Sequence, residues 1–197
     1  MNSAGESLSP EQRTLLQEAA EWRLISLLFE CPTGSWREQL VQLKAEVIDP
    51  VLRQAVEAAQ VEASEGIYHS LFGPGGPVPP RAVTYHGGVE AGHLLSDIAA
   101  YYQAFAYRPE TMEADDHLSV ETGFIAYLKV KEAYALGCGD PEHASLASEA
   151  GQSFLENHLS TFVAPLLESL EASAPPYLVL AGKALQAHIE HRLCGRP

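Results

Sequence analysis

The nine-residue stretch EADDHLSVE, residues 113–121, lies between a proline-containing loop and an apolar run with helical spacing. It carries four carboxylates and one histidine. Asp115 or Asp116 is suited to cap the helix that follows, and acidic residues in a first helical turn complement the helix dipole. Capping leaves His117 and Glu121 unexplained, and these side chains lie one turn apart on the same face of a helix. Two interpretations of the stretch therefore stay open, a helix cap and a binding site.

Helical patterns extend from this stretch in both directions. Ser9 is suited to cap a helix with Pro10 at its first position, and the sequence SWRE at residues 35–38 matches a second capping box. Apolar positions of the first helix fall on more than one stripe, so we expect it to be buried on two sides. No segment alternates as a half-buried strand would. The sequence predicts an all-α fold of about eight or more helices, over residues 10–29, 36–47, 51–59, 61–72, 89–105, 117–136, 141–159, 162–170 and 177–193.

A glycine- and proline-rich segment interrupts the helices in mid-chain. Its sequence GPGGPVPP, residues 73–80, is incompatible with a helix or a central strand. The segment lacks the lysine and the preceding strand of a phosphate-binding loop. We interpret residues 73–84 as an ordered or mobile loop that joins two helical subregions, about 9–72 and 85–193, within a single domain of residues 1–197.

The formal net charge of −14 over 197 residues restricts the classes of partner. Nucleic acids and anionic membrane surfaces are bound by clusters of Lys and Arg, which this chain lacks, so we expect no nucleic acid and no stable membrane association. Cationic partners, including arginine-rich peptides, are favoured. Three separated cysteines, an N-terminus unlike a signal peptide and the lack of a membrane-length apolar run predict a cytoplasmic protein.

Histidines offer an enzymatic alternative. His117 with Glu121, and His188 with His191, are spaced to place two metal ligands on one helix face. Neither pair has a third ligand at a characteristic spacing, and we interpret the second pair as exposed helix residues. No nucleophile motif is present. We therefore expect no catalysis, no metal and no cofactor, and keep as the alternative a small helical metal-dependent hydrolase that uses His117 and Glu121.

Three motifs, in this order, carry a resemblance to a known family. They are YHSLFGPGGP at 68–77, continuing to Pro80 and Tyr85, then ExxDHLxxE at 113–121, followed by Phe124, then HLxxFxxxL at 158–166. Their order and spacing cover residues 11 to about 170 and resemble the TorD/DmsD/NarJ family of cytoplasmic chaperones for molybdenum-containing oxidoreductases. The chain departs from the family's frequent residues at four positions, with Ala82 and Val83 for Glu-Ser, Asp115 for Pro and Phe162 for Trp.

The resemblance implies an all-helical fold, no catalytic turnover and binding to the N-terminal region of a molybdopterin-containing reductase or dehydrogenase subunit. Such a region is commonly a twin-arginine export signal, which the chaperone holds back until the cofactor is inserted. Carboxylates beside an apolar groove suit a peptide that joins guanidinium groups to an apolar stretch. The residues that we expect to bind the peptide are Asp116, His117, Glu121, Glu113, Tyr101, Tyr102, Phe124 and Tyr127.

Two further points stay open on the sequence alone. A helical adaptor without a reductase client is a third interpretation of the function. The chain is expected to be a monomer or a domain-swapped dimer, because a proline-rich connection allows two protomers to exchange helical halves.

Overall fold

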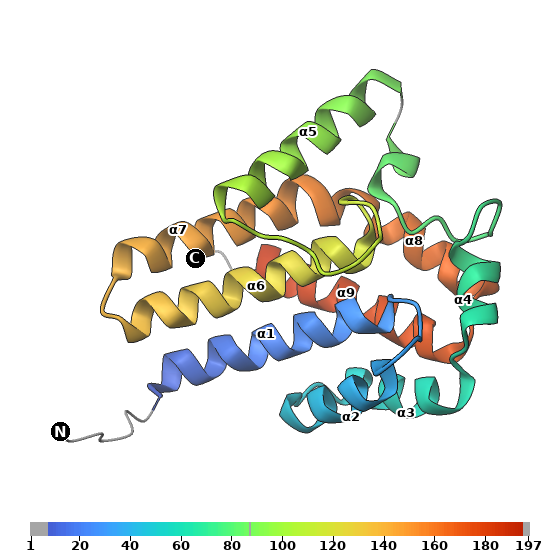
Figure 1. Cartoon of the computed structure of the whole chain (residues 1–197), viewed down its shortest axis with the longest axis horizontal. Coiled ribbons are helices and arrows are strands. Elements are labelled where there is room, and N and C mark those ends of the chain that lie inside the picture. Colours follow the sequence, from blue (N-terminus) through green and yellow to red (C-terminus); the bar gives the residue numbers. More distant parts are fainter. Residues whose placement is uncertain (1–7, 87, 195–197) are drawn as a thin grey trace.

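The computed structural model describes residues 8–86 and 88–194, and within these ranges it contains helices and loops but no strand. One isolated β-bridge, between Arg81 and His117, joins extended residues there. The all-α prediction is confirmed. The elements in chain order (Figure 1) are α1 (Pro10–Leu28), α2 (Trp36–Glu46), α3 (Pro50–Glu62), α4 (Glu65–Phe72), the 3-10 helix η1 (Ala82–Tyr85), α5 (Gly88–Ala104), α6 (Leu118–Gly137), α7 (Pro141–Phe154), the π-helical turn η2 (Leu155–Leu159), α8 (Ser160–Ser173) and α9 (Pro176–Cys194).

Local capping fixes the start of α1 as the sequence predicts. Gln12 N donates to Ser9 Oγ at 3.1 Å, and Ser9 N donates to Gln12 Oε1 at 2.9 Å. The capping box predicted at residues 35–38 is wrong. The Ser35 side chain makes no cap hydrogen bond, because its backbone (φ −83°, ψ 13°) is not extended as a capping residue usually is. Its Oγ instead accepts from Gln39 Nε2 at 2.9 Å.

An antiparallel pair of helices, α1 and α6, forms the centre of the bundle (Figure 1). The C-terminal half of α1 lies against the N-terminal end of α6, where Ser26 Oγ donates to Ser119 O at 2.7 Å. At the opposite end, Gln12 Nε2 donates to Ala133 O at 3.2 Å. Apolar side chains on several sides of α1 are buried, which confirms the expectation of burial on two sides; they include Trp22, Leu24, Ile25, Leu27 and Leu28. Each contributes about 1.5–3 kcal/mol to stability.

Helix α9 is joined to α1 by a partly buried ion pair. His188 Nε2 lies 3.1 Å from Glu21 Oε2, and His188 Nδ1 lies 2.8 Å from Ala184 O. The interpretation of His188 as an exposed residue is therefore wrong, whereas His191 is exposed. Burial alone would lower the pKa of His188, but the hydrogen bonds to Glu21 and Ala184 outweigh it and raise this pKa above its usual value.

The glycine- and proline-rich loop is fixed against the start of α6. Leu118 N donates to Pro80 O at 2.9 Å, and Ala82 N donates to Asp116 O at 3.0 Å. Ala82 itself is fully buried. These backbone bonds make residues 80–83 an ordered segment that lies directly over the acidic stretch.

Helix α5 runs at an angle to α6 and α7 (Figure 1), and its side chains attach it to the bundle. Tyr101 Oη lies 2.8 Å from Ser153 Oγ on α7. Asp97 Oδ2 lies 3.0 Å from His158 Nε2 on η2, at ion-pair distance but without the alignment of a hydrogen bond. These contacts bring the aromatic residues of α5 over Phe124 of α6.

Candidate functional site

The acidic stretch leads into α6, but its aspartates do not cap this helix. His117 is the N-cap residue, and its Nδ1 accepts from Ser119 N at 3.2 Å. The prediction that Asp115 or Asp116 caps the helix is wrong. The Asp115 side chain is exposed, and the Asp116 side chain turns away from the helix toward the loop over it. The aspartates are therefore available for roles other than capping.

Asp116 is a buried carboxylate that is bound by Arg81. Arg81 Nε donates to Asp116 Oδ1 at 2.8 Å, and Arg81 Nη2 lies 2.7 Å from the same oxygen. Val83 N donates to Asp116 Oδ2 at 3.1 Å. The Asp116 side chain is fully buried, whereas 44% of the Arg81 side chain is exposed. In the free protein the positive charge of Arg81 compensates the negative charge of Asp116, and the ion pair holds residues 81–83 against the start of α6.

A hydrogen-bonded chain connects His117 to the surface. Tyr68 Oη donates to Glu113 Oε1 at 2.8 Å and lies 3.4 Å from His117 Nε2. Burial lowers the pKa of His117 and outweighs the carboxylates of Glu113 and Asp116, so the imidazole is neutral at pH 7. Because Nδ1 accepts from Ser119, we assign the ring proton to Nε2, where it faces Tyr68. Glu113 ends the chain at the surface, with 34% of its side chain exposed.

Glu121 is fully buried, and neither of its carboxyl oxygens has a hydrogen-bond partner within the described ranges. Burial, and then the nearby charge of Asp116, raise the pKa of Glu121 well above its usual value. The neutral, protonated form of the side chain is therefore favoured. An unpaired buried polar group costs about 1–3 kcal/mol, so its presence calls for a functional explanation.

Two of the aromatic residues predicted to bind a peptide, Tyr101 and Tyr102, pack against a third, Phe124. The ring centroid of Phe124 lies 4.8 Å from that of Tyr102, 5.0 Å from Phe154 and 6.4 Å from Tyr101. Phe124 and Tyr102 are buried, and Tyr101 is half-buried. This cluster joins α5, α6 and α7, and it forms part of the core beneath the acidic stretch.

The eight predicted site residues thus fall into two groups. Those that are buried are Tyr102, Asp116, His117, Glu121 and Phe124. Those that reach the surface are Tyr101, Glu113 and Tyr127.

Sequence reasoning missed Arg81, although a signal was present. Arg81 is the only Lys or Arg between Arg53 and Arg108, and an isolated cation in an acidic region is a candidate partner for a buried carboxylate.

A groove of about 660 Å³ runs between α1, α6 and residues 106–111. Because α1 and α6 are antiparallel, the C-terminal end of α1 and the N-terminal end of α6 meet at one end of the groove. That end is polar and the opposite end is apolar. The lining residues are Leu16, Ala19, Ala20, Arg23, Ser26, Glu30 and Leu43, the segment 106–111 with Tyr107, and Ser119, Val120, Gly123, Ala126, Tyr127 and Val130 of α6.

Side chains of α1 organise the polar end of this groove. Arg23 donates to Glu30, and Arg23 Nη1 also donates to Ser26 Oγ at 2.8 Å. A Cβ atom at Gly123 would lie 2.8 Å from Tyr107 Oη and 3.2 Å from Ser26 Oγ. A glycine at this position therefore allows residues 106–111 to approach α1 and α6 closely.

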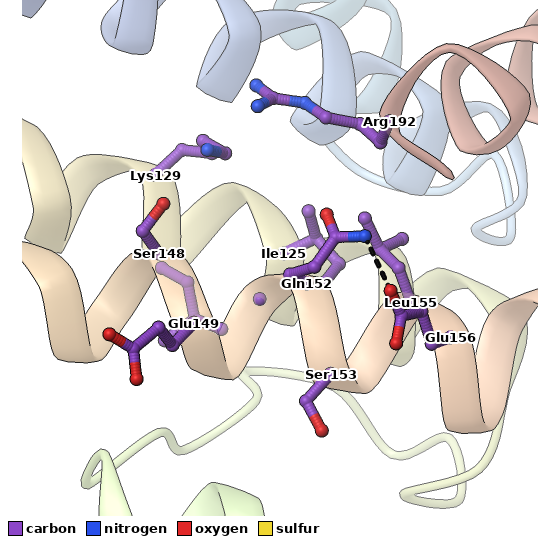
Figure 2. Close-up of a pocket in the computed structure, with 11 residues that line it drawn as sticks. Ile125, Lys129, Ser148, Glu149, Gln152, Ser153, Leu155, Glu156 and Arg192 are labelled. Atoms are coloured by element: carbon purple, nitrogen blue, oxygen red, sulfur yellow. Dashed lines mark hydrogen bonds between the residues drawn. The ribbon is translucent and has the colours of Figure 1, made fainter. Parts of the chain in front are cut away.

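A second cavity, of about 370 Å³, has a more polar lining of charged residues and lies beside α6, α7 and α9 (Figure 2). Its two cations are already paired. Lys129 lies 2.8 Å from Glu132 and 3.6 Å from Glu18, and Arg192 donates to Glu18. Neither of its cations is therefore free to bind an anionic ligand without breaking an ion pair.

The geometry gives the hydrolase alternative no support. Among residues 8–86 and 88–194, no group of three or more His, Cys, Asp or Glu side chains is arranged to hold a metal ion. The two ring nitrogens of His117 face Ser119 and Tyr68.

Fold and site together define an all-α protein that presents a groove with an apolar end and a polar end. Residues 32–168 match the sequence pattern of the family described as nitrate reductase delta subunit, and the chain belongs to that family. The family consists of maturation chaperones for molybdenum-containing redox enzymes, which confirms the resemblance to TorD/DmsD/NarJ chaperones. A comparison with curated proteins gave no match. None of the described helices is both long and apolar enough to cross a bilayer.

Proposed function

We propose that this protein binds the N-terminal, twin-arginine-type leader of the catalytic subunit of a molybdopterin oxidoreductase. The bound leader is withheld from export while the cofactor is inserted and the subunit folds. In this role the chain catalyses no reaction and holds no cofactor of its own. It acts in the cytoplasm, without stable membrane association, as a monomer or a domain-swapped dimer.

The polarity of the groove between α1, α6 and residues 106–111 carries this proposal. From Leu16 to Ser26 the groove follows α1 for about 15 Å, at the helical rise of 1.5 Å per residue, and Glu30 lies just beyond the end of the helix. Leu16 and Val130 line its apolar end, and Glu30 lines its polar end. A twin-arginine leader has the same polarity, because its guanidinium groups precede an apolar stretch.

The polar end of the groove carries the carboxylate of Glu30, which is paired with Arg23 in the free protein. Glu30 follows the C-terminus of α1, where the helix dipole is negative. Glu113 lies near Glu30, because both carboxylates act on Tyr68. Burial is the largest cause that raises the pKa of Tyr68, and the hydrogen bond and charge of Glu113 and the charge of Glu30 raise it further. Charge-assisted hydrogen bonds between a carboxylate and a guanidinium contribute about 1.5–3 kcal/mol each.

Within this proposal the predicted residues act at two levels. Glu113 and Tyr127 reach the surface and contact the leader, and Tyr127 lines the groove directly. The buried residues position them: His117 holds Tyr68 and Glu113, and the cluster around Phe124 supports α6 beneath the groove.

Fluorescence anisotropy with three synthetic peptides tests the proposal. The first has Arg-Arg followed by an apolar stretch, the second replaces both arginines by citrulline, and the third replaces the apolar stretch by serine. Citrulline keeps the shape of arginine but not its charge. We expect the first peptide to bind at least about tenfold more tightly than either of the others. Equal affinity for all three, or no binding of the first, would contradict the proposal.

A further inference from the structure

The buried carboxylate of Asp116 is occupied by an arginine of the same chain. Two guanidinium nitrogens of Arg81 lie within 2.8 Å of Asp116 Oδ1. Asp116 is fully buried, yet 44% of the Arg81 side chain is exposed. The guanidinium therefore reaches Asp116 from solvent, and another guanidinium can approach by the side from which Arg81 enters.

Glu121 supplies an unused acceptor near Asp116. It is fully buried, and its two oxygens are without hydrogen-bond partners in the part of the chain that the structure describes. The charge of Asp116 acts on it and adds to the effect of burial on its pKa. Asp116 is thus paired with Arg81, whereas Glu121 keeps its capacity to accept hydrogen bonds from a guanidinium.

The Arg81 side chain is not needed to hold its own segment in place. Backbone bonds join Leu118 to Pro80 and Ala82 to Asp116, and Val83 N donates to the Asp116 side chain. Residues 80–83 therefore stay attached to α6 when the Arg81 side chain rotates into solvent.

We propose that Asp116 and Glu121 form a guanidinium-binding site that Arg81 fills in the free protein and that an arginine of the client leader takes over by displacing Arg81. The inference rests on the proposed function for the source of the incoming arginine. Exchange replaces one cation by another at Asp116 and by itself gives a ligand little net binding free energy. A ligand binds tightly only when further contacts, such as those in the groove, hold it in place. Arg81 thereby lowers the apparent affinity for isolated arginine side chains and makes the site selective for a complete leader. Lysine lacks the fork of donors and is a poorer replacement.

Removal of the internal competitor tests this site. The variant Arg81→Gln is titrated with the arginine peptide and with the citrulline peptide. Arg13→Gln is the matched control, because it removes the same charge from an exposed position on α1. We expect Arg81→Gln to raise the affinity for the arginine peptide by about tenfold relative to Arg13→Gln. The affinity for the citrulline peptide should be the same in both variants.

Each outcome of the titration is decisive. If the wild-type chain binds the arginine peptide and Arg81→Gln binds it equally or more weakly, the internal-competitor site is overturned while the proposed function stands. If neither protein binds the peptide, both are overturned. If only Arg81→Gln binds, the site is supported.

Thermal melting confirms that the variants are folded at the assay temperature. If Arg81→Gln is not, Arg81→Lys takes its place, and a rise in affinity of about threefold is expected from its weaker hold on Asp116.

Discussion

Arg81 and Asp116, which are 35 residues apart in sequence, form an ion pair with Arg81 Nε 2.8 Å from Asp116 Oδ1. This pair joins the glycine- and proline-rich loop to the residue that precedes the N-cap of α6. It places a surface cation over a fully buried carboxylate, so it influences both the stability of the loop and the charge that a ligand meets.

The first prediction concerns the stability that this pair provides. Asp116→Asn keeps an oxygen for Val83 N but removes the charge that holds Arg81. Because Arg81 is half exposed and solvent weakens the attraction, we expect the free energy of unfolding to fall by about 1 kcal/mol. Asp115→Asn is the control, since the exposed side chain of Asp115 is not involved, and it should change this free energy by less than about 0.5 kcal/mol. Urea denaturation measures both, and equal effects would contradict the structural role of Asp116.

Glu121 should make the protein less stable as the pH rises. Its pKa in the folded state is raised above the usual 4.5, so the folded state binds a proton that the unfolded state has released. Stability is then lost progressively from about pH 4.5 up to the raised pKa, by at most about 1.4 kcal/mol per pH unit. Glu121→Gln removes this loss, so the free energy of unfolding of the variant should increase relative to that of the wild type as the pH rises. A stability difference that stays constant from pH 5 to pH 8 would show that Glu121 is not held protonated.

The groove itself is tested by a pair of valines. Val130 lines the apolar end and is 47% exposed, whereas Val61 on α3 is 86% exposed and lies outside the groove. Val130→Gln should weaken binding of the arginine peptide by about three- to tenfold, because it removes part of an apolar contact. Val61→Gln should leave the affinity unchanged. The same loss in both variants, measured by anisotropy, would place the peptide elsewhere.

His188 should stabilise the protein most at low pH. Both ring nitrogens face acceptors, Glu21 Oε2 and Ala184 O, so the protonated ring satisfies both. Because the pKa of His188 is raised in the folded state, its contribution is complete below the unfolded value of about 6.5 and is lost as the pH rises through the folded value. His188→Gln should therefore cost about 1.5 kcal/mol at pH 5.5 and clearly less at pH 8.5. A larger loss of the free energy of unfolding at pH 8.5 than at pH 5.5 would contradict a raised pKa of His188.

Local signals made the helices predictable. The capping box at Ser9 and the Asp140-Pro141 start of α7 depend on side chains within one turn, and both helices begin where these residues indicate. Residues 35–38 have the same pattern without the cap bond, because the backbone of Ser35 (φ −83°, ψ 13°) is not extended. Helix ends are therefore predictable only where local and tertiary preferences agree.

Tertiary partners of charged residues were not predictable. Asp116 has the sequence context of a helix cap, but Arg81 from a loop 35 residues earlier binds it. His188 has the context of an exposed residue, but Glu21, 167 residues away, lies beside it. The groove likewise depends on α1 and residues 106–111 meeting across α6. Apart from the isolation of Arg81 in an acidic region, the sequence patterns record spacing along one element and do not show which elements adjoin.

The most direct test of leader binding uses a complete client. A candidate client, a molybdopterin-containing subunit that carries a twin-arginine leader, is prepared with and without that leader, and each form is titrated into the protein by calorimetry. Binding of the complete subunit, with affinity lost when the leader is deleted and a negative heat-capacity change from apolar burial, is the expected result. Equal binding of both forms, or binding of neither, would contradict the account.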